Sequence, residues 1–74
     1  MISELRVHFY EGRIVKNYLF DHSIEDVTEW FSDEINACNA RGDAAFILES
    51  EDKFAAIYPA FISFWEVVIV SEDI

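Results

Sequence analysis

The segment spanning residues 21–40 carries six carboxylates and no lysine or arginine, and its apolar side chains recur at helical spacing. These apolar residues are Ile24, Val27, Trp30, Phe31, Ile35 and Cys38. Positions three and four apart fall on one side of a helix, so the pattern predicts one amphipathic helix with a buried stripe. Ser23 is a typical N-cap residue with Asp26 at capping-box spacing, and Gly42 is typical of a helix C-terminus. We therefore expect a helix near residues 23–41.

Short β-rich segments on both sides of this helix predict strands. The expected strands cover residues 5–10, 14–20, 44–49, 54–58 and 62–70, with a polar tail at 71–74. Pro59 cannot donate a hydrogen bond to a ladder, so it ends the fourth strand or lies at an edge. Short turns between neighbouring strands indicate antiparallel pairing. The order β-β-α-β-β(-β) predicts an α+β fold in a single domain over 1–74, with an antiparallel sheet of four to five strands and one helix packed on one face.

The later strands carry apolar residues on both faces. Ala45 and Ile47 alternate with Phe46 and Leu48, and the last strand has Phe64, Val68 and Val70 on one face and Trp65, Val67 and Ile69 on the other. Strands of this kind are normally buried on both faces, whereas one helix covers only one. We therefore expect a second copy of the chain to cover the open sheet face in a homodimer. The aromatic residues expected at that interface are Tyr10, Tyr18, Phe20, Tyr58, Phe61 and Trp65.

The net charge excludes several kinds of partner. Fifteen acidic residues against five basic ones give a net charge of −10 on 74 residues. Direct binding to nucleic acid or to anionic lipid needs clustered lysine and arginine, so neither is expected. The longest apolar run, residues 60–70, is about half the ~20 residues that a membrane span needs. Charged side chains within the first twenty residues are unlike a secretory signal, so we expect a cytoplasmic protein.

No residue pattern indicates an enzyme, a metal site or a cofactor. The chain has two glycines, which is too few for a phosphate-binding loop, and it contains no HExxH motif. Its single cysteine, Cys38, lies on the apolar stripe of the helix and is expected to be a buried thiol. His8 alternates outward with Arg6 and Tyr10, so it is expected on the solvent face of a strand, and His22 directly precedes the N-cap, where it is expected to be structural. We therefore expect no catalytic, metal or cofactor residues.

The carboxylates in and before the helix are the candidate partner-binding residues. They are Asp21, Glu25, Asp26, Glu29, Asp33 and Glu34. One interpretation is a solvated surface that keeps an apolar chain in solution. The sharper interpretation is a surface for a basic, nucleic-acid-binding protein, because carboxylates along a helix repeat at spacings comparable to those of backbone phosphates.

In size, charge and aromatic content, the chain resembles small accessory proteins of phages and mobile elements. Some of these proteins inhibit nucleases or CRISPR effectors by presenting acidic surfaces to nucleic-acid-binding grooves. The resemblance implies a non-enzymatic, anti-defence inhibitor that mimics nucleic acid, and it transfers no functional residue. The alternative is a structural or assembly protein that acts mainly through homodimerisation of the open sheet face.

Overall fold

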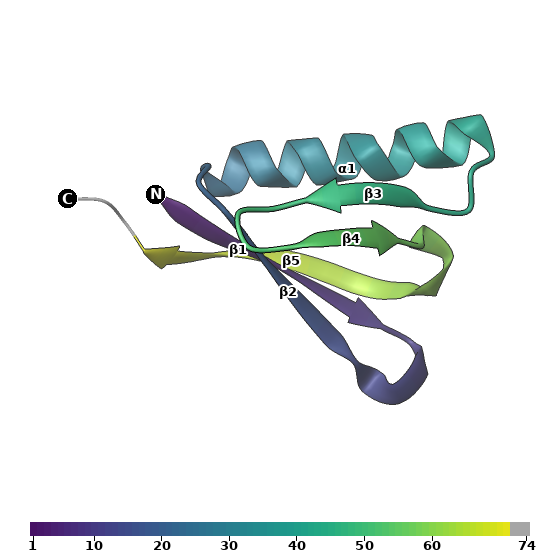
Figure 1. Ribbon diagram of the computed structural model, residues 1–74, viewed down its shortest axis with the longest axis horizontal. Helices are drawn as coiled ribbons and strands as arrows, with labels where there is room; N and C mark the ends of the chain where they lie inside the picture. Colours follow the sequence, from purple (N-terminus) through teal and green to yellow (C-terminus); the bar gives the residue numbers. More distant parts are fainter. Residues whose placement is uncertain (72–74) are drawn as a thin grey trace.

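A computed structural model describes residues 1–71 and shows one helix above a set of antiparallel strands (Figure 1). The elements are β1 (Ile2–Phe9), β2 (Val15–Phe20), α1 (Ile24–Arg41), β3 (Phe46–Glu49), β4 (Phe54–Ile57) and β5 (Ile62–Ser71), with short 3-10 helices at Glu11–Arg13 and Pro59–Phe61. The α+β class, the antiparallel pairing and the packing of the helix on the strands are confirmed. The predicted polar tail lies outside the described residues, except for Ser71, which ends β5.

The strands form two antiparallel sheets, where the sequence analysis expected one. β1 lies at the centre of a three-stranded sheet of order β2-β1-β5, with Leu5 paired to Tyr18 on one side and to Val67 on the other. β3 and β4 form a separate two-stranded sheet. The turn of this hairpin meets the edge of β2, where Glu51 N–H donates to Leu19 O at 2.8 Å. Beyond that point β4 diverges from β2, so the two strands form no ladder (Figure 1).

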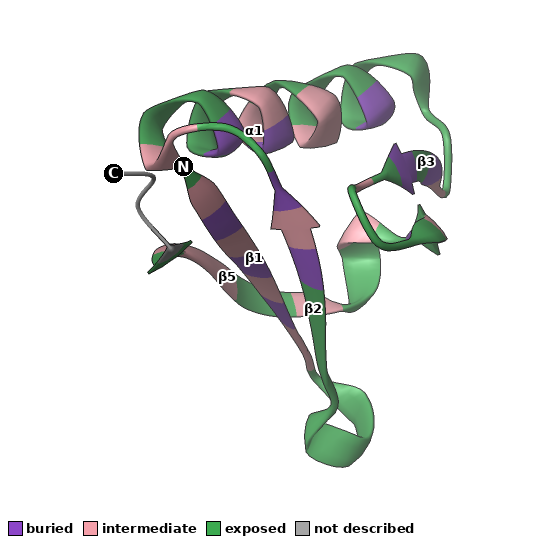
Figure 2. Cartoon of the chain, turned by 60° about the vertical axis from the view of Figure 1, so that its left-hand side comes forward, coloured by how far each residue is buried: buried purple, intermediate pink, exposed green. Residues whose placement is uncertain are grey.

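The core lies between α1 and the two sheets, and purple segments mark it in Figure 2. Its buried apolar residues are Leu5, Val7, Tyr18, Phe20, Val27, Phe31, Cys38, Phe46, Leu48 and Ile57. Phe31 is fully buried at the centre, with ring centroids 4.9 Å from Trp65 and 5.9 Å from Phe46. The helical side chains predicted to pack the core therefore do so: Val27, Phe31 and Cys38 are buried, and Ile35 packs against them.

Both ends of α1 are capped by the residues that the sequence indicated. The Ser23 hydroxyl accepts a hydrogen bond from Asp26 N–H at 3.1 Å, which satisfies a free amide of the first turn. Gly42 has a left-handed backbone with φ of 73°. Its N–H donates to Asn39 O, and Asp43 N–H donates to Cys38 O. These paired bonds form a Schellman motif, which ends the helix and satisfies its last carbonyls.

The far face of the three-stranded sheet, opposite α1, is polar along β1, where the alternation of the sequence predicts an outward-facing His8. Glu4, Arg6 and His8 alternate on β1 with the buried residues and point to this face. Arg6 Nε lies 2.6 Å from Glu4 Oε1, and His8 Nε2 lies 3.0 Å from Glu66 Oε2 on β5. Covering this ion-pair network would remove paired charges from water, which is costly. The homodimer expected from the apolar later strands stays a prediction, and the exposed apolar side chains that it could cover on β5 are Phe64, Ile69 and Val70.

Candidate functional site

The outer side of α1 carries an uninterrupted set of exposed carboxylates, here called the acidic face: Glu25, Asp26, Glu29 and Asp33. A helix turns by about 100° per residue, which places these four side chains within an arc of about 100°. Their residues are all exposed. Among residues 1–71, no lysine, arginine or histidine forms an ion pair with any of the four. The acidic face therefore presents one sign of charge on a rigid, capped element.

Two of the six predicted carboxylates lie apart from this face. Glu34 is half-buried and stands about 140° around the helix from Glu29. A side-chain hydrogen bond with Asp43 raises the pKa of Arg41, and the charge of Glu34 adds a smaller contribution in the same direction. Asp21 precedes the helix, and its carboxylate lies 3.6 Å from the N-terminal ammonium group. The acidic face therefore keeps four of the six predicted carboxylates, and these four are neighbours on the surface of the helix.

The six aromatic residues predicted at an oligomer interface divide into two groups. Tyr18 and Phe20 are buried in the core, and Trp65 is half-buried against Phe31, so the prediction of an exposed interface is wrong for these three. Their rings fill the space beneath α1 and the β3–β4 hairpin.

The other three predicted interface residues lie at the surface. Tyr10, Tyr58 and Phe61 are exposed by 68%, 45% and 57%. Tyr10 N–H donates to Phe61 O, and the rings of Tyr58 and Phe61 are 6.0 Å apart. Tyr58 and Phe61 form an exposed aromatic cluster, and the backbone of Tyr10 joins it where the β1–β2 turn meets the Pro59–Phe61 turn.

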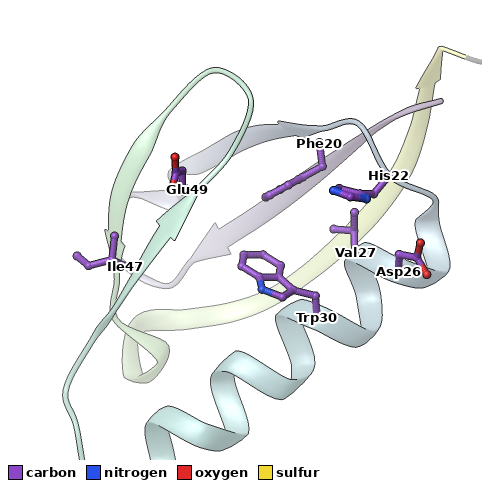
Figure 3. Close-up of a pocket in the computed structure, with 7 residues that line it drawn as sticks. All are labelled: Phe20, His22, Asp26, Val27, Trp30, Ile47 and Glu49. Atoms are coloured by element: carbon purple, nitrogen blue, oxygen red, sulfur yellow. The ribbon is translucent and has the colours of Figure 1, made fainter.

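A hollow of about 590 Å³ lies next to the acidic face and was not predicted from the sequence (Figure 3). Its lining residues are Phe20, His22, Asp26, Val27, Trp30, Ile47 and Glu49. The rings of Phe20 and Trp30 form its apolar floor, with centroids 5.4 Å apart, and the exposed residues Ile47 and Glu49 of β3 border its other side. Residues from β2, α1 and β3 meet only in the folded chain. The position of Trp30 at the edge of the apolar stripe is the single local signal of this hollow.

The cysteine and the first histidine, Cys38 and His8, make contacts that stabilise the fold. Cys38 is fully buried, and its Sγ donates to Asp43 O at 3.3 Å. His8 stacks on Phe64 with ring centroids 3.9 Å apart. Within residues 1–71, no three side chains of histidine, cysteine, aspartate or glutamate are placed to hold a metal ion. In the same part of the chain, no helix is long and apolar enough to cross a membrane.

The arrangement therefore offers surfaces for contact: an acidic helix face, an adjoining aromatic hollow, an aromatic cluster and an open strand edge. The chain matches no model of a known protein family, and comparison with curated proteins and with solved structures finds no match.

Proposed function

We propose that this protein is a non-enzymatic binding module that docks its acidic face on a basic surface of another protein. The observation that supports this proposal is the set of four exposed carboxylates on α1 that have no ion-pair partner among the described residues. A nucleic-acid-binding protein is the partner class we favour, because its binding groove already carries the clustered lysine and arginine that such a face attracts. Occupying that groove would make the protein a nucleic-acid-mimicking inhibitor, of the kind that phages and mobile elements use against host defence.

The energetics of the helix favour a binding role over solubility alone. Glu25, Glu29 and Asp33 follow one another at four-residue spacing, and like charges at this spacing destabilise a helix by about 0.2–0.5 kcal/mol per pair. Alternating glutamate and lysine would solubilise the same surface without this cost. A field of one sign, however, steers a basic partner and raises the association rate about 10–10³-fold at low salt. The repulsion among Glu25, Glu29 and Asp33, kept despite its cost to the helix, is thus consistent with selection for binding a basic partner.

Affinity capture with matched baits tests this proposal. The first bait is the unmodified protein, the second carries Glu29→Lys and Asp33→Lys, and the third carries Glu11→Lys and Glu51→Lys. Both double variants change the net charge from −10 to −6, and all four residues are exposed. We expect basic, nucleic-acid-binding proteins on the first and third baits and their loss from the second. Equal recovery on all three baits would refute a role for the acidic face.

Self-association is a second candidate function, and the open edge of β5 favours it. β5 ends the order β2-β1-β5, so its outer side pairs with no other strand of the described chain. Ile69 and Val70 are exposed on this ten-residue strand, which contains no lysine or proline of the kind that protects edges. The flank of α1 opposite Trp30, which we place on the β5 side of the sheet, carries the uncharged residues Thr28, Ser32, Ile35 and Asn39, and Glu25 borders it. A second copy could pair along β5 while both acidic faces stay exposed.

Light scattering of a β5 variant tests the homodimer. We expect Ile69→Lys to convert a dimer into a monomer, and Phe54→Lys, an equally drastic change at an exposed residue of β4, to leave the dimer intact. A monomer in the unmodified protein at high micromolar concentration would refute self-association.

The buried free thiol of Cys38 suits a reducing compartment, so we propose that the protein acts in the cytoplasm in either role.

A further inference from the structure

The hollow beside the acidic face combines an aromatic floor with a negative rim (Figure 3). Trp30 is half-buried, so part of its ring remains open to the hollow, and Phe20 closes the floor behind it. Asp26 stands at the helix end of the rim, with its carboxylate turned outward, and Glu49 stands on β3 across from it. Among the described residues, no lysine or arginine lines the hollow, and His22 is the other titratable side chain there.

This chemistry fits a cation that has an apolar stem. The stem of a long basic side chain can pack against Phe20 and Val27, because lysine and arginine bury their methylene groups while the charged head stays near water. The head can lie over the ring of Trp30, the aromatic side chain that attracts cations most strongly. A planar guanidinium stacks on a ring and bonds carboxylates with two parallel N–H groups, which an ammonium group cannot do.

We propose that the hollow is an anchor site for one arginine side chain of the basic partner. The inference rests on the proposed function and adds the residue that the partner inserts. Asp26 belongs both to the acidic face and to the rim, and Trp30 directly follows Glu29 in α1. A basic surface laid along the acidic face therefore brings an arginine within reach of the hollow. Pockets that bury an arginine or an aromatic residue often dominate the binding energy of an interface.

A small-molecule titration followed by NMR tests the anchor without any knowledge of the partner. The probe is N-acetylargininamide, and its neutral isostere N-acetylcitrullinamide is the control. We expect arginine to shift the Trp30 indole N–H saturably, with an affinity on the order of millimolar. The second tryptophan, Trp65, packs against Phe31 and does not line the hollow, so its indole signal should stay in place. Citrulline should shift neither signal.

Two conservative variants separate the hollow from general electrostatics. Glu49→Gln removes a charge from the rim and should weaken arginine binding about threefold to tenfold. Glu51→Gln removes a charge from the adjoining turn, outside the hollow, and should leave the affinity unchanged. Equal affinities of the two variants, or equal shifts at Trp30 and Trp65, would overturn the proposal.

The same variants keep this inference distinct from the proposed function. Glu29→Lys with Asp33→Lys should abolish partner capture, yet it should leave arginine binding to Trp30 measurable, because neither residue lines the hollow. If Glu49→Gln does not reduce partner capture, the arginine anchor is disproved, while the proposal that the acidic face binds the partner is unaffected. Arginine binding at Trp30 with no capture by the acidic face would disprove the function instead.

Discussion

At the scale of single residues, Phe31 holds the two sheets and the helix together. It is fully buried, and its ring contacts Trp65 on β5 and Phe46 on β3. We expect Phe31→Ala to lower the free energy of unfolding by about 3–5 kcal/mol, enough to unfold a domain this small. Urea denaturation measures this change, with exposed Phe54→Ala as the control that should stay near the unmodified value. A loss below ~1 kcal/mol would contradict the central place of Phe31.

Substitution of Gly42 tests how the helix ends, because the left-handed backbone of this residue is the feature that favours glycine there. A Cβ atom added there would meet no other atom of residues 1–71 within 4 Å, so substitution adds strain without a clash among them. We expect Gly42→Ala to cost about 1–2 kcal/mol and Gly42→Asn to cost less, since asparagine tolerates this conformation. Thermal unfolding of the two variants checks the order. A more stable alanine variant would show that the helix ends differently.

The residues that sequence reasoning located correctly are those with local causes. Ser23 and Gly42 cap α1 through bonds to residues within five positions, and Phe31 follows from helical periodicity alone. Tyr18 and Trp65 were misplaced at an interface because their burial depends on α1 and the β3–β4 hairpin folding over them. Sequence spacing carries no such long-range information.

At the scale of elements, the β3–β4 hairpin is tied to β2 by its turn. Asp52 Oδ1 accepts a hydrogen bond from Leu19 N–H at 3.1 Å and another from the Ser50 hydroxyl at 2.9 Å. Glu51 N–H donates to the carbonyl of the same Leu19. These turn contacts are the hydrogen bonds that join the hairpin to β2, since the two sheets of the described chain share no strand ladder. They also hold β3 in place on one side of the hollow, so the hollow could not be predicted from local pattern.

The stability that the hydrogen bonds to Asp52 provide should depend on pH in a defined direction. The hydrogen bonds from Leu19 and Ser50 lower the pKa of Asp52, because they stabilise the ionised carboxylate. Their contribution to stability is therefore present above the ordinary aspartate pKa of about 3.9 and is lost as the pH falls through the lowered value. We expect the NMR shift of the Leu19 amide to titrate with a midpoint below 3.9, and Asp52→Ala to abolish that titration. A midpoint above 3.9 would contradict the hydrogen bonds.

At the scale of the whole molecule, the charge is distributed unevenly. Four of the fifteen acids lie on the acidic face, whereas Arg6 and Arg41 are paired with nearby carboxylates. Self-repulsion of like charges opposes folding and is screened by salt. We expect the thermal midpoint to rise as sodium chloride increases from about 0.01 M to about 0.15 M, and to rise less for Glu29→Lys with Asp33→Lys. A midpoint that falls with salt would indicate that ion pairs outweigh repulsion.

The most direct test of the proposed binding surface is the salt dependence of binding to a captured basic partner. Isothermal titration at several salt concentrations measures it for the unmodified protein and for the two double variants of equal net charge. We predict that the logarithm of the affinity falls steeply with the logarithm of salt for the unmodified protein and for Glu11→Lys with Glu51→Lys. Glu29→Lys with Asp33→Lys should bind weakly and lose most of this slope. Identical affinities and slopes for all three proteins would contradict the claim that the acidic face of α1 is the binding surface.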